Sequence, residues 1–319
     1  MTDMPRAARS DTVVVVCLPD VPERIHMGEF PANVDVRLVP PEPEPVPDVA
    51  EVDLIVPDER TREPLLELLA GSPVRLRVIQ TTSAGVDWLV GRVPEHVKVC
   101  NARGVYDAPL AEWVVGAILA MQRGLVQSRD AQARREWDAI EPPELSGRRV
   151  VILGLGSIGS AIADRLRPFG VEIIGVGRTA RDGVRGLADL DEVLRDAEIL
   201  VNMLPQTSET TGLLDARRLS LLPDGALVVN AGRGRTIETA ALVEELQGGR
   251  IRAALDVTDP EPLPPDHPLW GLPNVLISPH MAGDSPGSKI RAFELAGDQI
   301  RRFATGEPLI NEVARYLLD

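Results

Sequence analysis

The sequence has few cysteines, few histidines and no long apolar run, and each shortage excludes a class of protein. Its two cysteines, Cys17 and Cys100, end separate apolar runs in a chain of 319 residues, which indicates reduced core thiols and not a disulfide framework. No apolar run is long enough to span a bilayer, and the polar residues 1–11 lack the pattern of a signal peptide. We therefore expect a cytoplasmic protein, with no bound metal.

Basic residues are also in the minority. The chain has 34 Lys and Arg against 48 Asp and Glu, a formal net charge of −14. Such a charge weighs against nucleic acid or an anionic membrane as a partner, and an anionic ligand must then be bound by a local group of arginines. The hydrophobic content of 44% and the charged content of 26% are those of a soluble globular protein, long enough for two domains.

One stretch, residues 149–179, has the pattern of a dinucleotide-binding unit. The apolar run 150–153 predicts a strand buried on both faces, a helical pattern follows, and a second apolar run, 171–176, closes the unit within about 30 residues. A GxGxxG turn joins the first strand to the helix. Because a strand lies on each side of this unit, dinucleotide binding is favoured over an ordinary βα turn. The turn that we expect to bind a diphosphate at the positive end of the helix contains Gly154, Gly156, Ser157, Ile158 and Gly159.

The end of the second strand indicates which dinucleotide is favoured. NAD sites usually have Asp or Glu at this strand end, about 20 residues after the glycine turn, where the carboxylate accepts a hydrogen bond from the ribose 2′-OH. Here Gly177 stands at that place, followed by Arg178 and Thr179, with Arg181 nearby. A carboxylate would repel a 2′-phosphate, whereas glycine leaves room and a guanidinium binds it. The pattern favours NADP(H), and a solvated surface arginine, with NAD(H) as the cofactor, stays open as the alternative.

Apolar runs and helical patterns alternate along the whole chain, which predicts parallel sheets with helices on both faces. In the first half we expect strands at 13–17, 34–39, 52–56, 74–80 and 97–100, and a helix at 61–69 that ends at Gly71. In the second half we expect strands at 150–153, 171–176, 199–204, 226–230, 253–257 and 275–278, and a helix at 239–247.

The fold class that follows is α/β, with two doubly wound parallel-sheet domains and a cleft between them. A Rossmann nucleotide-binding domain, 104–285, is predicted to be inserted into a flavodoxin-like substrate-binding domain, 1–103 and 286–319. The amphipathic helix 108–123 would connect the two. Residues 127–145 are polar and fit no regular element, so we interpret them as an arm over the cleft or against a second subunit.

Several residues that follow predicted strands have small or polar side chains suited to a ligand site. In open α/β sheets, ligands bind at the carboxyl ends of the strands. In the first half, Ser83, Ala84 and Gly85 follow a strand, and their small side chains would let main-chain N–H groups face a carboxylate. In the second half the corresponding residues, at or after strand ends, are Pro205, Thr207, Ala231, Gly232, Arg233, Asp256, Glu261, His280 and Gly283. Of these, we expect Pro205, Thr207, Ala231, Gly232, Asp256 and Gly283 to bind the cofactor.

Four of these residues together suit hydride chemistry on a carbonyl group. Arg233 could hold a carboxylate and still direct an N–H at the neighbouring carbonyl oxygen, and His280 could transfer a proton near neutral pH. A carboxylate from Asp256 or Glu261 would orient the histidine ring. Each residue alone also has an ordinary explanation, as a loop arginine, a hydrogen-bonded loop histidine, a strand-end cap or a solvated acid. The other three histidines lie in proline- or charge-rich connections.

Four blocks of the second half, GLGSIG, VNAGRG, ALDVTDPEPLP and LISPHMAG, resemble the D-2-hydroxyacid dehydrogenase family in spacing and order. The run TTSAGVD is similar to the family's substrate-carboxylate loop, and residues 300–313 are similar to its closing segment. The resemblance implies that Arg233 binds and polarises a 2-oxo acid and that Glu261 and His280 form the proton-donating pair. It also implies that Asp256 hydrogen-bonds the nicotinamide carboxamide, while Ala84 and Gly85 bind the substrate carboxylate.

The activity that the resemblance implies is reduction of a small 2-oxo acid to the (R)-2-hydroxy acid. The Gly177–Arg178–Thr179 step is similar to NADPH-dependent glyoxylate/hydroxypyruvate reductases, so glyoxylate and hydroxypyruvate are the first substrates to expect. The family also implies a homodimer. A dinucleotide-sensing binding protein or corepressor on the same fold is the alternative. The complete Arg, Glu and His set weighs against it, because a sensor has little use for a proton donor.

Overall fold

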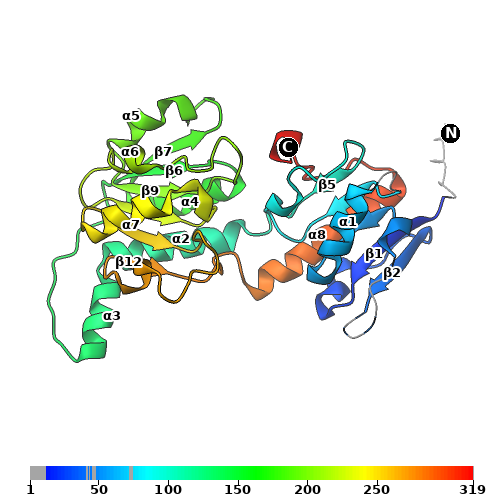
Figure 1. Ribbon diagram of the computed structural model, residues 1–319, viewed down its shortest axis with the longest axis horizontal. Helices are drawn as coiled ribbons and strands as arrows, with labels where there is room; N and C mark the ends of the chain where they lie inside the picture. Colours follow the sequence, from blue (N-terminus) through cyan, green and yellow to red (C-terminus); the bar gives the residue numbers. More distant parts are fainter. Residues whose placement is uncertain (1–11, 41, 43, 45–47, 72–74, 319) are drawn as a thin grey trace, which may run out of the picture. The chain divides into compact units, whose positions relative to one another are not determined.

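The computed structural model describes residues 12–318 except 41, 43, 45–47 and 72–74. The chain divides into two compact units: unit 1 is Met1–Val105 with Ser285–Asp319, and unit 2 is Tyr106–Asp284. Each unit is built on one parallel sheet (Figure 1). The beginning of the strand expected at 74–80, the polar residues 1–11 and part of residues 40–47, a proline-rich stretch between two expected strands, lie outside the described residues.

Five parallel strands form the sheet of unit 1, in the order β2-β1-β3-β4-β5. This is the flavodoxin-like order, with the reversal of strand order at β1 and β3, so the fold class expected for this part is confirmed. All neighbouring pairs are parallel, as repeated βα units require. The strands are β1 (Val14–Pro19), β2 (Val34–Val39), β3 (Leu54–Ile55), β4 (Val78–Gln80) and β5 (Lys98–Cys100).

Helices cover both faces of this sheet. Alternate side chains of β1 belong to different cores, because successive side chains of a strand point to opposite faces. Cys17 packs in the core that includes residues of α1 (Glu59–Ala70), whereas Val16 packs in the core that includes residues of α8 (Pro286–Thr305). Both faces are therefore buried, which explains why the strand reads as a continuous apolar run.

The two long helices of unit 1 begin and end at residues suited to those positions. A capping box opens α1, in which the Asp58 carboxylate accepts from the Thr61 N–H and the Thr61 hydroxyl accepts from the Asp58 N–H. A second capping box, at Ser285, opens α8, with Pro286 in its first turn. The helix ends at Gly306, whose φ of 76° lies in the left-handed region that glycine tolerates.

The two cysteines are buried free thiols, as expected from their positions in apolar runs. Cys17 lies in β1 and Cys100 ends β5. Burial raises the pKa of each thiol to about 11, so both stay protonated near neutral pH.

Seven parallel strands form the sheet of unit 2, in the order β12-β11-β10-β9-β6-β7-β8. Counted from β6, this is the Rossmann order 3-2-1-4-5-6 with one further strand beside the sixth, which confirms the expected fold class. The carboxyl ends of all seven strands therefore face one edge of the sheet. The strands are β6 (Arg149–Leu153), β7 (Glu172–Gly177), β8 (Val184–Gly186), β9 (Ile199–Asn202), β10 (Leu227–Asn230), β11 (Arg252–Leu255) and β12 (Val275–Ile277).

Helices also lie on both faces of this second sheet. One core includes buried residues of α2 (Asp107–Gln122) and α4 (Ser157–Leu166). The other includes buried residues of α5 (Leu190–Leu194), α6 (Ala216–Leu219) and α7 (Thr239–Gln247). Of the helices in the described ranges, none combines the length and the apolar character needed to cross a bilayer.

The interpretation of residues 127–145 as irregular is wrong for its first half. Residues Leu125–Arg134 form a helix, α3, and only the part after Arg135 is irregular. In Figure 1, α3 and the loop after it project from the rest of unit 2. Of the helix's residues only Ala131 is buried, so the sequence has no apolar stripe to signal a helix. The short elements β8 and α5 were likewise not anticipated.

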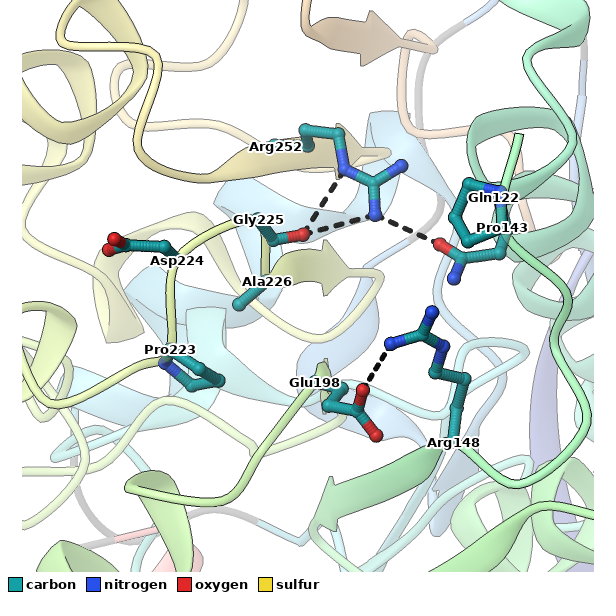
Figure 2. A pocket seen from close by; sticks show the side chains of 9 residues that line it. All are labelled: Gln122, Pro143, Arg148, Glu198, Pro223, Asp224, Gly225, Ala226 and Arg252. Carbon is teal, nitrogen blue, oxygen red and sulfur yellow. Dashed lines mark hydrogen bonds and ion pairs between the residues drawn. The ribbon is translucent and has the colours of Figure 1, made fainter. Parts of the chain in front are cut away.

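A cavity of about 360 Å³ lies at the opposite, amino-terminal edge of the same sheet. There the Arg252 guanidinium donates to the Gly225 carbonyl and to the Gln122 side chain, and Arg148 pairs with Glu198 (Figure 2). Arg252 also donates to the Met121 carbonyl. Burial, with the charge of Arg148, lowers the pKa of Arg252. Because Met121 is in the last turn of α2, Arg252 ties the end of this helix to the sheet. We assign the cavity a structural role.

Gly297 in α8 provides a test of how unit 1 is packed. A Cβ at Gly297 would lie 2.1 Å from the Met27 carbonyl oxygen, a backbone atom of the 3₁₀ helix Pro22–Met27. Gly297→Ala should therefore lower the free energy of unfolding by about 1–3 kcal/mol, measured by urea denaturation. Gly116→Ala is the matched control, because Gly116 is helical with open space around it; it should be neutral or stabilise by up to about 1 kcal/mol. Equal effects of the two substitutions would contradict this packing.

Candidate active site

The glycine turn between β6 and α4 is shaped by close backbone contacts and opens at one glycine. A Cβ at Gly154, whose φ is 91°, would lie 2.7 Å from the Met203 carbonyl oxygen, and a Cβ at Gly159 would lie 2.3 Å from the Gly154 carbonyl oxygen. Gly156, in contrast, has open space where its Cβ would be. The first and third glycines are therefore needed for packing, and the second leaves the backbone accessible.

This turn fits a dinucleotide diphosphate. Gly156 is the N-cap of α4 and supplies no side chain to cap the helix, so the positive end of the helix faces the open space. The Ser157 hydroxyl hydrogen-bonds the Asp107 carboxylate of α2, which leaves the main-chain N–H groups as the donors suited to a phosphate. Ile158 packs against the core on the inner side of the helix.

Two arginines lie at the end of β7, where the sequence predicts the adenosine ribose. Gly177 is the last residue of the strand. Arg178 follows it, and its Nη2 lies 2.9 Å from an Oε atom of Glu209, an acid that the sequence analysis did not identify. Arg181 donates from Nη2 to the Leu155 carbonyl within the glycine turn, at 2.7 Å. Thr179, next to Arg178, is exposed.

The loops after β9 and β10 are held together by a buried amide pair. The side chain of Asn202, the last residue of β9, donates to the side chain of Asn230, the last residue of β10, at 2.9 Å. The Asn230 oxygen also accepts from the Gly232 N–H at 3.1 Å. A Cβ at Gly232 would lie 2.9 Å from the Leu204 carbonyl oxygen, so the two loops approach closely. In the sequence, this pair could have been found from the asparagine that lies in each of two neighbouring apolar runs, 199–204 and 226–230.

The remaining expected cofactor residues lie on the same loops or on the loop after β12. Pro205 and Thr207 follow β9, and Ala231 follows β10. The Pro205 carbonyl accepts from the Thr210 hydroxyl, which fixes the first of these loops. Gly283 follows β12, and its Cβ would lie 3.1 Å from the ring of Tyr106 at the start of α2.

Arg233 is carried by a backbone that is fixed from two sides. Its carbonyl accepts from the Asn230 side chain at 3.2 Å and from the Thr236 hydroxyl at 2.6 Å. The following residue, Gly234, leaves no space for a Cβ, which would lie 1.9 Å from the Thr258 carbonyl oxygen. The loop that carries Arg233 therefore packs directly on the segment that leads to Glu261.

Asp256 is buried and holds the loop after β12. One carboxylate oxygen accepts from the Ser278 hydroxyl at 2.5 Å and from the Met281 N–H at 2.9 Å, and the other accepts from the Ala282 N–H at 3.0 Å. The Asp256 carbonyl accepts from the His280 N–H at 2.8 Å. The observed contacts thus brace the loop, and the second carboxylate oxygen keeps capacity for one more donor.

His280 and Glu261 form a close pair, as the resemblance implies. The His280 Nδ1 lies 2.5 Å from a carboxylate oxygen of Glu261, and about half of the histidine side chain is exposed. His280 has a φ of 51°, in the left-handed region that residues other than glycine seldom adopt. Such a conformation persists only where surrounding contacts impose it, and here the hydrogen bonds that residues 280–282 donate to Asp256 do so.

The loop after β4 in unit 1 has its carbonyl groups engaged on one side. Ser83 O accepts from the Ala102 N–H and the Thr81 hydroxyl, and Ala84 O accepts from the Asn101 side chain. In a trans peptide the C=O and the next N–H point in opposite directions. The N–H groups of Ala84 and Gly85 therefore point away from the groups that hold these carbonyls.

Comparison with known proteins identifies the family. Residues 115–282 match the family model of the NAD-binding domain of D-isomer-specific 2-hydroxyacid dehydrogenases. The chain belongs to this family. It is an NAD(P)-dependent oxidoreductase, as the resemblance of its four sequence blocks implies.

Individual relatives agree with this assignment. The chain is 35% identical to a glyoxylate reductase from Thermofilum pendens over 76% of its length and 75% of the relative's. It is similar to a D-isomer-specific 2-hydroxyacid dehydrogenase from Xanthobacter autotrophicus Py2, solved in complex with NADPH and MES, with 33% identity, a TM-score of 0.79 and coverage of 94% and 98% of the two chains. It is also similar to an NADPH-dependent glyoxylate/hydroxypyruvate reductase from Sinorhizobium meliloti, in complex with NADP and sulfate, with 28% identity, a TM-score of 0.82 and coverage of 97% and 100%. D-3-phosphoglycerate dehydrogenases are also among the relatives.

The bracing role of Asp256 can be tested by an isosteric substitution. Asp256→Asn places an amide N–H₂ among donors from Ser278, Met281 and Ala282, so at least one hydrogen bond is lost in a buried position. The free energy of unfolding should fall by about 1–3 kcal/mol, measured by chemical denaturation. Asp266→Asn, at an exposed position, should change it by less than about 0.5 kcal/mol. If Asp256→Asn lowers the free energy of unfolding no more than Asp266→Asn does, the Asp256 carboxylate does not brace the loop.

Proposed function

We propose that the protein reduces a small 2-oxo acid to the (R)-2-hydroxy acid, with NADPH as the preferred reductant and His280 as the proton donor. The observation that carries the proposal is the His280–Glu261 pair, at 2.5 Å, on a loop braced by a buried carboxylate in a member of this oxidoreductase family. When bound, the nicotinamide supplies the hydride. The remaining steps belong to side chains of this chain.

Glu261 sets the tautomer and the direction of the histidine ring. In the protonated ring both nitrogens carry a proton. The Nδ1–H donates to the Glu261 carboxylate, so the proton on Nε2 is the one available for transfer to the carbonyl oxygen of the substrate. The positive φ of His280 and the hydrogen bond from its N–H to the Asp256 carbonyl hold the ring against Glu261, which supports this role.

Arg233 is assigned to bind the substrate and polarise its carbonyl group. A guanidinium can form two parallel hydrogen bonds to a carboxylate or share its donors with an adjacent oxygen. It also stabilises the negative charge that develops on the carbonyl oxygen during hydride transfer. The fixed backbone at Arg233 supports this role, because preorganised donors lose less entropy on binding.

Unit 1 is assigned the recognition of the substrate carboxylate. The main-chain N–H groups of Ala84 and Gly85 are the donors, and the bond from the Ser83 hydroxyl to the Gly85 carbonyl, at 2.8 Å, stiffens the loop. We also assign the domains accordingly, with 1–103 and 286–319 as the substrate-binding domain and 104–285 as the nucleotide-binding domain.

The cofactor assignment is supported by the end of β7. Gly177 stands where NAD-binding relatives would have an acid, and Arg178 and Arg181 supply two positive charges beside the glycine turn. The solved relatives from Xanthobacter autotrophicus Py2 and Sinorhizobium meliloti contain NADPH and NADP. The loops with Pro205, Thr207, Ala231, Gly232 and Gly283 complete the proposed cofactor site, in which the free capacity of Asp256 is assigned to the nicotinamide carboxamide.

Glyoxylate and hydroxypyruvate are the proposed substrates, since relatives are named as reductases of these acids. The test is NADPH oxidation with a panel of 2-oxo acids. His280→Ala should lower kcat by about 10²- to 10⁴-fold, because the proton donor is lost, with the Kd for NADPH changed less than twofold. His96→Ala, at an exposed histidine of unit 1, is the control and should leave both values unchanged.

Near-normal turnover by the His280 variant would remove this residue from the mechanism. Tight NADPH binding without turnover of any 2-oxo acid would instead favour the dinucleotide-sensing alternative.

We further propose a cytoplasmic homodimer in which α3 and its following loop contact the partner. Apolar side chains are exposed there, with Trp137 101% exposed together with Leu125 and Ile140. Sedimentation at micromolar concentration should show a dimer, and Trp137→Ser should weaken association at least about tenfold, because large aromatic side chains dominate interface energies. The exposed aromatic of η7 (Pro268–Gly271) is the control: Trp270→Ser should leave association unchanged. A monomeric unmodified protein would refute the proposal.

A further inference from the structure

Glu209 is an acid in direct contact with Arg178, the residue proposed to bind the 2′-phosphate. Its Oε1 lies 2.9 Å from Nη2 of Arg178, and both side chains are about half exposed, at 54% and 48%. Arg178 directly follows β7, whereas Glu209 lies on the loop after β9. Arg181, in contrast, donates to a main-chain carbonyl, that of Leu155. Two arginines and the Glu209 carboxylate, which opposes them, therefore contribute to the charge at this end of the sheet.

The loop that carries Glu209 has a defined backbone. Thr207 N–H donates to the Thr210 hydroxyl at 2.8 Å, the Thr210 hydroxyl donates to the Pro205 carbonyl at 2.7 Å, and the Thr211 N–H donates to the Thr207 carbonyl at 3.0 Å. These bonds lie on both sides of Glu209 in the sequence. The Glu209 carboxylate is thus held next to Arg178 by a fixed turn. A ligand that binds to Arg178 would therefore lie close to the negative charge of Glu209.

The two cofactors respond differently to this carboxylate. A 2′-phosphate carries about 1.5 to 2 negative charges near neutral pH, so it competes with Glu209 for Arg178 and is repelled by it. The ribose of NADH has a neutral 2′-hydroxyl, which can donate a hydrogen bond to a carboxylate. We propose that Glu209 is a specificity-determining residue that opposes Arg178 and narrows the preference for NADPH over NADH. This inference rests on the cofactor assignment of the proposed function.

The expected effect is moderate, because the pair is exposed to solvent and screened by salt. Glu209→Gln keeps the size of the side chain and removes its charge. The Kd for NADPH should fall about three- to tenfold, while the Kd for NADH changes less than twofold. The gain should shrink as the salt concentration rises, since mobile ions screen exposed charges.

Binding is measured without turnover, by the fluorescence of the reduced nicotinamide and by calorimetry with the fragments 2′,5′-ADP and 5′-AMP. The fragments isolate the ribose phosphate, so 2′,5′-ADP should gain affinity in Glu209→Gln and 5′-AMP should not. Glu172→Gln is the matched control. Glu172 is also paired with an arginine, Arg149, but it begins β7, whereas Arg178 follows the end of this strand. This control substitution should alter neither Kd, and the melting curves of both variants should match that of the unmodified protein.

Arg178→Met separates failure of this inference from failure of the cofactor assignment. If Arg178→Met weakens NADPH binding and Glu209→Gln strengthens it, both are supported. If Arg178→Met weakens NADPH binding but Glu209→Gln leaves it unchanged or weakens it, Glu209 positions Arg178 or is inert, and only the present inference is overturned. If Arg178→Met leaves NADPH binding unchanged, the 2′-phosphate assignment fails and the inference fails with it.

Discussion

The buried carboxylate of Asp256 is the interaction on which the proposed catalytic loop depends. It directly follows β11 and accepts hydrogen bonds from the Ser278 hydroxyl and from the N–H groups of Met281 and Ala282. Burial of a charge is costly, and here three donors offset that cost. In return the loop at His280 adopts a backbone conformation with positive φ, which places the ring against Glu261. The carboxylate is therefore structural first, whatever it binds in addition.

The parallel sheet explains how residues far apart in the sequence reach one edge. Arg178, Arg233 and His280 each follow a different strand, and in a parallel sheet all carboxyl ends lie on the same side. The loops are then joined by short contacts between their backbones, such as that of Gly234 with Thr258. Catalytic and binding groups can therefore vary on the loops while the strands keep the same apolar core.

Much of this arrangement could be predicted from the sequence because strand ends are strong signals. Apolar runs located every described strand except β8 to within a few residues, and the glycine turn located α4. The His280–Glu261 pair followed from the resemblance of its sequence blocks to a known family, and the structure shows the two side chains in contact.

Other features carry no local pattern. Helix α3 buries a single residue, so no apolar period marks it, and the length of β3 depends on its neighbours in the sheet. The contacts of Asp256 with residues 278–282 and of Arg178 with Glu209 join segments more than 20 residues apart. Which acid meets which donor is decided by loop conformation, and a single sequence does not encode that in any short motif.

The acidity of the chain gives these pairings a common consequence. With 48 acidic against 34 basic residues, an arginine placed to bind an anion has many carboxylates that can reach it. Arg181 has the main-chain carbonyl of Leu155 as a partner, and this contact does not cancel the charge of the guanidinium. Arg178 instead meets Glu209. Main-chain partners orient a guanidinium and preserve its charge for a ligand, whereas a carboxylate partner orients it and reduces the attraction. The strength of anion binding in this protein thus depends on which kind of partner holds each arginine.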